Sequence, residues 1–126
     1  MTVLRLVYMA NIVVAGYIGV TSLLFPKRSA ATIFQSVYQT NDLIRLVGCL
    51  WLGIAALSIC GVWQPANFSP VLLFQLIYKG SWLLVVAIPA VKNRQPYPSG
   101  MAIFFLVWVV VLPFVIPWSA WANQAN

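Results

Sequence analysis

Histidine is absent from this 126-residue chain, and Asp42 is its only acid. Without histidine, a zinc site, a typical haem site and a histidine general base are all excluded. A single carboxylate cannot supply the pair of acids that glycoside hydrolysis uses. The sequence also contains no Gly-rich phosphate loop and no nucleophile elbow. We therefore expect no metal site, no bound cofactor and no independent catalytic activity. One catalytic class stays open, namely an enzyme that uses a buried lysine or a lipid-bound quinone.

Charge is scarce throughout the sequence. Charged residues make up 6% of the chain and hydrophobic residues 63%, whereas a soluble domain is about 25% charged and about 45–50% apolar. Both departures indicate that lipid is the solvent. A transmembrane helix needs roughly 20 apolar residues, so four such helices and short loops use the whole chain. No length remains for a soluble catalytic domain.

Long apolar runs predict an all-α membrane protein with one domain over 1–126. We expect a bundle of four transmembrane helices at about 3–25, 42–63, 71–91 and 101–118. Between the first two, the segment 27–40 has apolar residues at helical spacing but is too short to cross the bilayer. It predicts a short amphipathic helix in the membrane interface, although an irregular loop would also fit. The first run is longer than the apolar core of a signal peptide, which is about 7–15 residues, so we expect it to be retained.

The helix limits follow from a few residues. Pro26 should end the first helix, because proline cannot continue the backbone hydrogen-bond ladder. Thr40 or Asn41 can cap the second helix. Near the end of the chain, Pro113 should kink the fourth helix and Pro117 should weaken its last turn.

The basic residues predict the orientation. Five of them belong to the first and third loops or their edges, and only Arg5 lies at the other end; the five are Lys27, Arg28, Arg45, Lys92 and Arg94. Because cytoplasmic loops collect Lys and Arg, we expect these loops in the cytoplasm and both termini outside the inner (plasma) membrane. The same rule explains the net charge of +6, so we expect no nucleic-acid partner.

Lys79 is the most informative residue, because it lies about nine positions into the third helix. A cation that deep costs on the order of 3 kcal/mol to insert. Gln75 lies one turn away on the same face and Tyr78 adjoins it, while Asn11 is the polar residue within the first helix. These four residues form our candidate contact site for a ligand or a partner. Three interpretations stay open: Lys79 extends along an apolar face to the interface, faces a ligand, or pairs with another protein.

Two further features concern the second helix. Asp42 and Arg45 are three residues apart, which places them side by side as a local ion pair at the interface; a contact of Arg45 with a quinone or a phosphate stays open as the alternative. Small residues recur along one face of this helix, at Cys49, Gly53, Ala56 and Cys60. Such a stripe favours close packing, within the bundle or with another subunit. The two cysteines are eleven residues apart, too far along one helix for a disulfide.

Short motifs give the chain a family resemblance. The first span ends Leu-Leu-Phe-Pro at Leu23–Pro26, and an amphipathic segment follows. The second span then opens with Leu46 between Arg45 and Val47-Gly48 and continues as Trp51-Leu52-Gly53. This order resembles the DoxX-like small four-helix bacterial membrane proteins. The resemblance implies an inner-membrane subunit, in some members associated with quinone-linked or sulfur-compound oxidoreductases, and it carries over no catalytic residue.

Two functions follow as expectations. The first is an accessory or scaffold subunit that binds other membrane proteins or further copies of itself, as part of a redox-linked complex. The second is a protein that binds or transports a lipid, a quinone or another small molecule in a pocket around Lys79. The direction of the Lys79 side chain distinguishes them.

Overall fold

The computed structural model describes residues 2–39 and 41–124, so Thr40, one of the two predicted capping residues, lies outside it. The described residues form helices and turns without a strand, which confirms the predicted all-α class. In chain order the elements are α1 (Thr2–Leu24), α2 (Pro26–Thr32), α3 (Asp42–Trp63), α4 (Pro70–Trp82), the π-helical turn η1 (Leu83–Ala87), α5 (Ile88–Lys92), α6 (Ser99–Val115) and α7 (Trp118–Gln124).

Three helical stretches are long and apolar enough to cross a membrane. They are α1, α3 and the continuous helix Pro70–Lys92, which joins α4, η1 and α5. α6 is also apolar but has 17 residues. Large apolar side chains face outward along these helices; Val13, Val85 and Phe114 are 71%, 72% and 88% exposed. An apolar outer surface of this kind is suited to lipid contact, so these helices fit a membrane protein.

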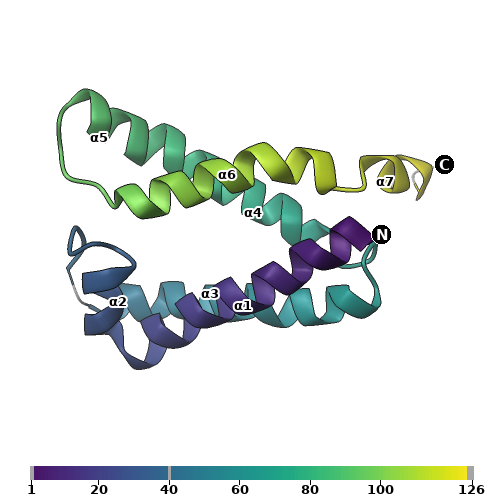
Figure 1. Ribbon diagram of the computed structural model, residues 1–126, viewed down its shortest axis with the longest axis horizontal. Coiled ribbons are helices and arrows are strands. Elements are labelled where there is room, and N and C mark those ends of the chain that lie inside the picture. The colour runs from purple at the N-terminus through teal and green to yellow at the C-terminus, as the bar shows by residue number, and fades with distance from the viewer. Residues whose placement is uncertain (1, 40, 125–126) are drawn as a thin grey trace.

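The helices form two layers. α1, α2 and α3 make one layer, and α4, α5 and α6 make the other (Figure 1). Within the layers, α1 packs closely against α3 and α4 packs against α6, while α3 and α4 approach each other at few positions. Buried apolar side chains of both layers form one cluster, in which Trp51 of α3 packs against Tyr78 and Phe105 in the space between the layers. The site described below lies in this space.

Two glycines allow α1 and α3 to cross closely. A Cβ atom on Gly48 would lie 2.8 Å from the backbone nitrogen of Leu23 and 2.9 Å from the carbonyl oxygen of Gly19. A Cβ atom on Gly19 would lie 2.9 Å from the backbone nitrogen of Leu52. Since backbone atoms cannot move aside as a flexible side chain can, only glycine fits this crossing.

Local signals set the ends of α1 and α3. α1 ends at Leu24, and Pro26 starts α2 as its first residue, where a missing N–H group costs nothing. The side chain of Asn41 accepts a hydrogen bond of 3.0 Å from the backbone nitrogen of Leu43, so it caps α3 as predicted. The limits of α3 coincide with the predicted 42–63.

The segment 27–40 differs from the prediction of one amphipathic helix. It is helical only to Thr32, and a turn follows. Gln35 and Ser36 have positive φ angles of 52° and 59°, which end a helix because left-handed residues break its ladder. The backbone nitrogen of Ser36 donates to the carbonyl of Ala30, six residues back, at 2.7 Å, which closes the turn that follows α2. The rest of the segment, residues 33–39, is a loop that runs across the end of the bundle.

A π-helical turn interrupts the helix Pro70–Lys92. The N–H of Ile88 donates to the carbonyl of Leu83, five residues back. Pro89 explains the wider turn, because it has no N–H to offer and its ring would collide with the carbonyl four residues earlier. The helix therefore continues through the proline and does not break.

The fourth predicted helix, 101–118, is corrected at both limits. α6 begins at Ser99 and ends at Val115, with Pro113 inside it. Ile116 is extended, with ψ 128°, because the residue before a proline avoids the helical region. Pro117 therefore ends the helix three residues earlier than expected, at Val115, and the separate short helix α7 follows.

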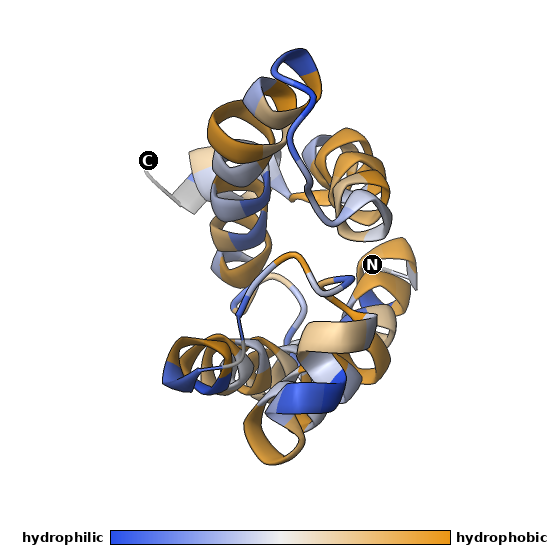
Figure 2. Cartoon of the chain, turned by 90° about the vertical axis from the view of Figure 1, so that its left-hand side faces the viewer, coloured by the Kyte–Doolittle hydropathy of each residue, from blue (hydrophilic) through white to orange (hydrophobic). Residues whose placement is uncertain are grey.

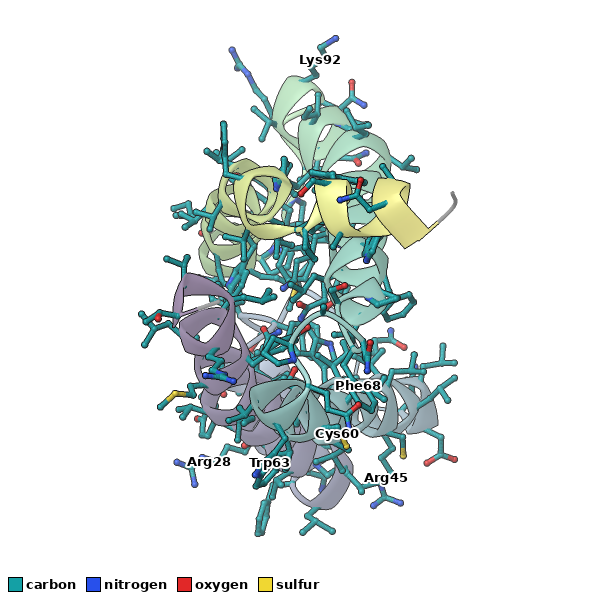
Figure 3. The ribbon with its side chains drawn as sticks, turned by 90° about the vertical axis from the view of Figure 1, so that its right-hand side faces the viewer. Arg28, Arg45, Cys60, Trp63, Phe68 and Lys92 are labelled. Atoms are coloured by element: carbon teal, nitrogen blue, oxygen red, sulfur yellow. The ribbon has the colours of Figure 1, made fainter. Side chains whose placement is uncertain are left out.

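The charges divide between the two ends of the bundle as the sequence predicts. α2, the start of α3 and the end of α5 lie at one end, and the start of α1 and the helix α7 lie at the other (Figure 1). Viewed along the bundle, hydrophilic colour marks α2, the start of α3 and the loop after α5, and it also appears along α4 (Figure 2). Arg28, Arg45 and Lys92 lie at the perimeter (Figure 3). Arg5, at the opposite end, donates to the carbonyl of Val62 at 3.1 Å.

Candidate functional site

Lys79 lies in the interior of the bundle. The residue is 1% exposed, so its side chain does not extend along the outer face of α4 toward the interface. The structure therefore differs from the interpretation in which Lys79 reaches along an apolar face to the interface. Within the described residues its ammonium forms no salt bridge, and Asp42, the only acid, pairs elsewhere.

Aromatic rings surround the Lys79 ammonium. Five ring centroids lie within 6 Å of Nζ, at 4.7 Å for Trp108, 5.3 Å for Trp51, 5.4 Å for Phe104, and 5.6 Å for both Tyr78 and Phe105. At this range the negative face of an aromatic ring attracts a cation. We call this arrangement the aromatic cage. Because its rings come from α3, α4 and α6, it joins the two layers around one charge.

Asn11 and Gln75 form a second link between the layers. The Asn11 amide nitrogen donates to Oε1 of Gln75 at 2.9 Å, and the Gln75 amide nitrogen donates to Oδ1 of Asn11 at 3.2 Å. Both residues are buried, at 2% and 0% exposure. Each amide therefore satisfies the other in an apolar surrounding, which makes the pair a structural contact between α1 and α4.

Two buried hydroxyl groups have no hydrogen-bond partner in the part of the chain that the structure describes. They belong to Ser58 on α3 and Tyr78 on α4. The amide of Gln75 lies close to the Tyr78 hydroxyl, but Asn11 engages both of its polar atoms. The interior of the bundle therefore contains more polar groups than it pairs.

A cavity of about 740 Å³ lies between α3 and α4, beside the aromatic cage. Its volume is in the range of about 300–1,000 Å³ that is usual for small-molecule sites. Along the helices the lining is apolar and largely aromatic, with Trp51, Phe74, Tyr78, Trp82 and Phe105 among its residues. Three of these rings, those of Trp51, Tyr78 and Phe105, also belong to the cage. These three side chains therefore separate the cavity from the Lys79 ammonium.

Polar residues line one end of the cavity. They are Tyr38 and Gln39 of the loop 33–39, and Asn41, which caps α3. The Tyr38 hydroxyl accepts a 3.2 Å hydrogen bond from Nε1 of Trp82. Within the described residues the hydroxyl proton of Tyr38 has no acceptor. This end of the cavity, which we call the polar mouth, is therefore able to donate a hydrogen bond to an occupant.

The loop 33–39 is tied to both helices of the second layer. Besides the bond from Trp82 to Tyr38, Gln35 accepts from the backbone nitrogen of Gly100 at 3.0 Å and from the Ser99 hydroxyl at 3.3 Å. These bonds reach α4 and the start of α6. The loop therefore spans the end of the gap between the layers, at the end of the bundle where the basic residues gather.

The residues predicted as a contact site separate in the structure. Tyr78 lines the cavity, Lys79 lies behind its wall in the cage, and Asn11 and Gln75 bond to each other. Asp42 and Arg45 lie 3.9 Å apart on the surface, with their side chains 99% and 54% exposed. An ion pair so exposed contributes little stability.

The polar mouth as a whole and the role of Phe105 carry no signal of their own in the sequence pattern that predicts the site. Phe105 belongs to a uniformly apolar stretch, where nothing distinguishes a residue that faces a cavity from one that faces lipid. Tyr38 did carry a signal, because it is an amphipathic residue next to a predicted membrane crossing. A scan against protein-family models matched none, and searches of curated proteins and of solved structures found no similar protein.

Proposed function

We propose that this protein binds a membrane-soluble, uncharged amphiphile in the cavity between α3 and α4. The observation that carries the proposal is the cavity itself, about 740 Å³ in volume, apolar along the helices and polar at one end. A lipid, a quinone or another small molecule with a flat or flexible apolar body has this distribution of polarity. The ligand would enter from the bilayer, because the helices on either side expose apolar residues outward.

The chemistry of the lining supports an uncharged polar group on the ligand. None of the residues that line the cavity is a Lys, Arg or Asp. The polar mouth instead offers the Tyr38 hydroxyl and the amides of Gln39 and Asn41. An oxygen of the ligand at this end would accept the free proton of Tyr38. The apolar body would then lie against the aromatic rings, which favour stacked or edge-on contact with a flat ligand.

In this proposal the pocket lies beside Lys79 and does not surround it. The ligand would touch the outer sides of Trp51, Tyr78 and Phe105, whose rings also lie near the Lys79 ammonium. Lys79 would act on the ligand only through these rings, by holding them in place. The lysine would thus be a positioning residue for the wall of the site.

Photolabelling tests the proposal. The probe is para-butylphenol with a diazirine at the end of its chain, added to the protein in lipid vesicles. We expect it to label residues of the cavity lining on α3 and α4, and excess unlabelled para-butylphenol to suppress the label. In Leu50→Trp, which places an indole at a lining position, the label should be lost.

Leu46→Trp is the matched control for this experiment. Leu46 lies one turn before Leu50 on α3 and is 55% exposed against 54%, but it does not line the cavity. Its label should equal that of the unmodified protein. Equal labelling of the two variants, or a label that excess phenol does not suppress, would show that the cavity is not a binding site.

A second candidate function is an accessory or scaffold subunit, and one observation favours it. The small residues Cys49, Gly53, Ala56 and Cys60 are all exposed on the outer face of α3, and nothing lies within 4 Å of a Cβ atom on Gly53. They do not pack within the described chain. A helix of a partner protein or of a second copy would approach closely there. The redox-linked character of the complex, and the DoxX-like family itself, rest on the resemblance alone.

Cross-linking through the two native cysteines tests this second candidate. Both are free and exposed on the same face. A bis-maleimide applied to native membranes should yield a reproducible cross-linked species, which Cys49→Ala together with Cys60→Ala abolishes. Recovery of the uncross-linked chain alone would exclude a second copy or another cysteine-bearing partner on this face.

We propose four crossings of a bacterial inner membrane, with α6 as the fourth and both termini outside. α6 is short, but tilting of the other helices and local thinning of the bilayer accommodate a short span at modest cost. The positions of the basic residues support this orientation. In a background without cysteine, an impermeant maleimide should label Asn67→Cys in intact cells and Ser36→Cys only after lysis. The reverse pattern would invert the orientation.

A further inference from the structure

A second, smaller cavity lies between α1 and α6. Its volume is about 260 Å³, and its lining is apolar except for one tyrosine hydroxyl; it consists of Val14, Tyr17, Ile18, Ile33, Met101, Phe104 and Phe105. This volume is below the range of about 300–1,000 Å³ that holds a whole drug-sized ligand. Such a cavity is suited to part of a ligand, and its lining is suited to a hydrocarbon part.

Two side chains separate the smaller cavity from the larger one. Met101 and Phe105 line both cavities, so the partition between them is one side chain thick. Both residues are buried, at 9% and 4% exposure, and they face the space between the layers. The loop follows the same division, because Ile33 lines the smaller cavity and the next residue, Phe34, lines the larger one.

The flexibility of Met101 determines which part of a ligand can pass between the two cavities. Methionine is unbranched and has three rotatable bonds, so it adapts to neighbouring shapes at low cost. A rotation of the Met101 side chain moves atoms that belong to both walls. A thin hydrocarbon chain is the kind of group that could lie beside such a residue, whereas a ring with polar substituents would require α6 to move.

We propose that the smaller cavity is a subsite for the hydrocarbon chain of the same ligand, which passes Met101 and Phe105 from the larger cavity. The inference rests on the proposed function and specifies it. The ligand class is then an amphiphile with a compact, uncharged head at the polar mouth and a long flexible chain that crosses the space between the layers. The chain would end among Val14, Ile18 and Ile33.

Two photoprobes of different chain length test this subsite. The short probe is the para-butylphenol diazirine described above, and the long probe is para-dodecylphenol with a diazirine at its chain end. In lipid vesicles we expect the short probe to label the larger cavity and the long probe to label Val14, Ile18 or Ile33. Excess unlabelled para-butylphenol should suppress both labels, because the two heads compete for one place. A long-probe label that the phenol does not suppress would mean that bilayer chains fill the smaller cavity, and it would overturn the proposal.

Met101→Trp should close the passage. We expect loss of the long-probe label on α1, with the short-probe label retained. Ile103→Trp is the matched control, because Ile103 lies on the same helix, is 66% exposed and lines neither cavity. If Met101→Trp does not fold, Val14→Trp fills the smaller cavity from α1 and should give the same loss.

The outcomes separate the two proposals. A short-probe label in the larger cavity, without a long-probe label on α1, would overturn the chain subsite and leave the proposed function standing. The absence of a competed label from both probes would overturn the proposed function and the subsite with it. An unchanged α1 label in both Met101→Trp and Val14→Trp would show that the chain does not take this route.

Discussion

Asn11 of α1 and Gln75 of α4 bond to each other through both amides, at 2.9 and 3.2 Å, across the space between the two layers of the bundle. The pair is buried in an apolar surrounding. It therefore sets how the layer of α1, α2 and α3 meets the layer of α4, α5 and α6. The cavity and the aromatic cage occupy the same interlayer space, so their shape depends on this contact.

Removal of one amide of the Asn11–Gln75 pair should destabilise the fold, and removal of the second amide should recover part of that loss. Asn11→Leu leaves the polar atoms of Gln75 buried without a partner, and we expect a cost of about 1–2 kcal/mol in unfolding free energy. In Asn11→Leu/Gln75→Leu no amide is stranded, so the second substitution should restore part of the loss. The free energy of unfolding in mixed micelles is measured for the unmodified protein, Asn11→Leu, Gln75→Leu and the double variant, which together form a double-mutant cycle. Strictly additive costs would show that the two residues do not interact.

The aromatic cage should appear as a coupling between Lys79 and its nearest ring. Trp108 lies 4.7 Å from the ammonium, and a desolvated cation–π contact is worth about 0.5–2 kcal/mol. We expect Trp108→Leu to cost that much more in the unmodified protein than in Lys79→Met. Trp82 is the control, because its ring meets Phe105 edge-on and is not among the rings around the ammonium. Equal coupling of Lys79 to both tryptophans would contradict the cage.

The close crossing of α1 and α3 predicts that alanine destabilises the protein at one glycine of α3 and stabilises it at another. Gly48→Ala would bring a Cβ atom within 2.8 Å of the Leu23 backbone nitrogen, so the helices must separate, at a cost of about 1–3 kcal/mol. Gly53→Ala on the same helix meets nothing within 4 Å, and alanine is the better helix former by about 1 kcal/mol. Thermal unfolding in detergent should rank the two variants on opposite sides of the unmodified protein. Similar behaviour of both would contradict the close crossing.

The polar mouth predicts a role for one hydroxyl group. Tyr38→Phe removes the donor that we assign to the ligand's oxygen. A net hydrogen bond of about 0.5–1.5 kcal/mol corresponds to roughly a two- to tenfold loss of affinity for para-butylphenol. Tyr97→Phe is the control, because Tyr97 lies at the same end of the bundle but lines neither cavity. Competition photolabelling over a concentration series gives both affinities, and an unchanged value for Tyr38→Phe would place the ligand's polar group elsewhere.

Much of the fold follows from local sequence signals. Pro26, Asn41 and the apolar runs place the first three spans within about one residue of where they lie, because a cap or a missing N–H group acts within one helical turn. The predictions fail where two signals compete. The apolar spacing after Arg28 favours a helix, but Gln35 and Ser36 take left-handed angles that end it.

The site is less predictable than the fold. The depth of Lys79 in an apolar helix correctly marks it as a residue with an unusual environment. Which rings surround it depends on how α4 rotates against α3 and α6, and that rotation follows from packing between helices that are apolar on every side. For the same reason the cavity has no counterpart in the sequence, since its lining comes from separate helices and from a loop predicted to be helical.

Native mass spectrometry of the protein, extracted gently with its own lipids, tests the central claim most directly. The unmodified protein and Leu46→Trp should carry one additional small molecule of constant mass, and Leu50→Trp should lack it. The mass would identify the head and the chain length of the natural ligand. A ligand in the α3–α4 cavity would be contradicted if the unmodified protein carries no such molecule. It would also be contradicted if all three proteins retain the molecule equally.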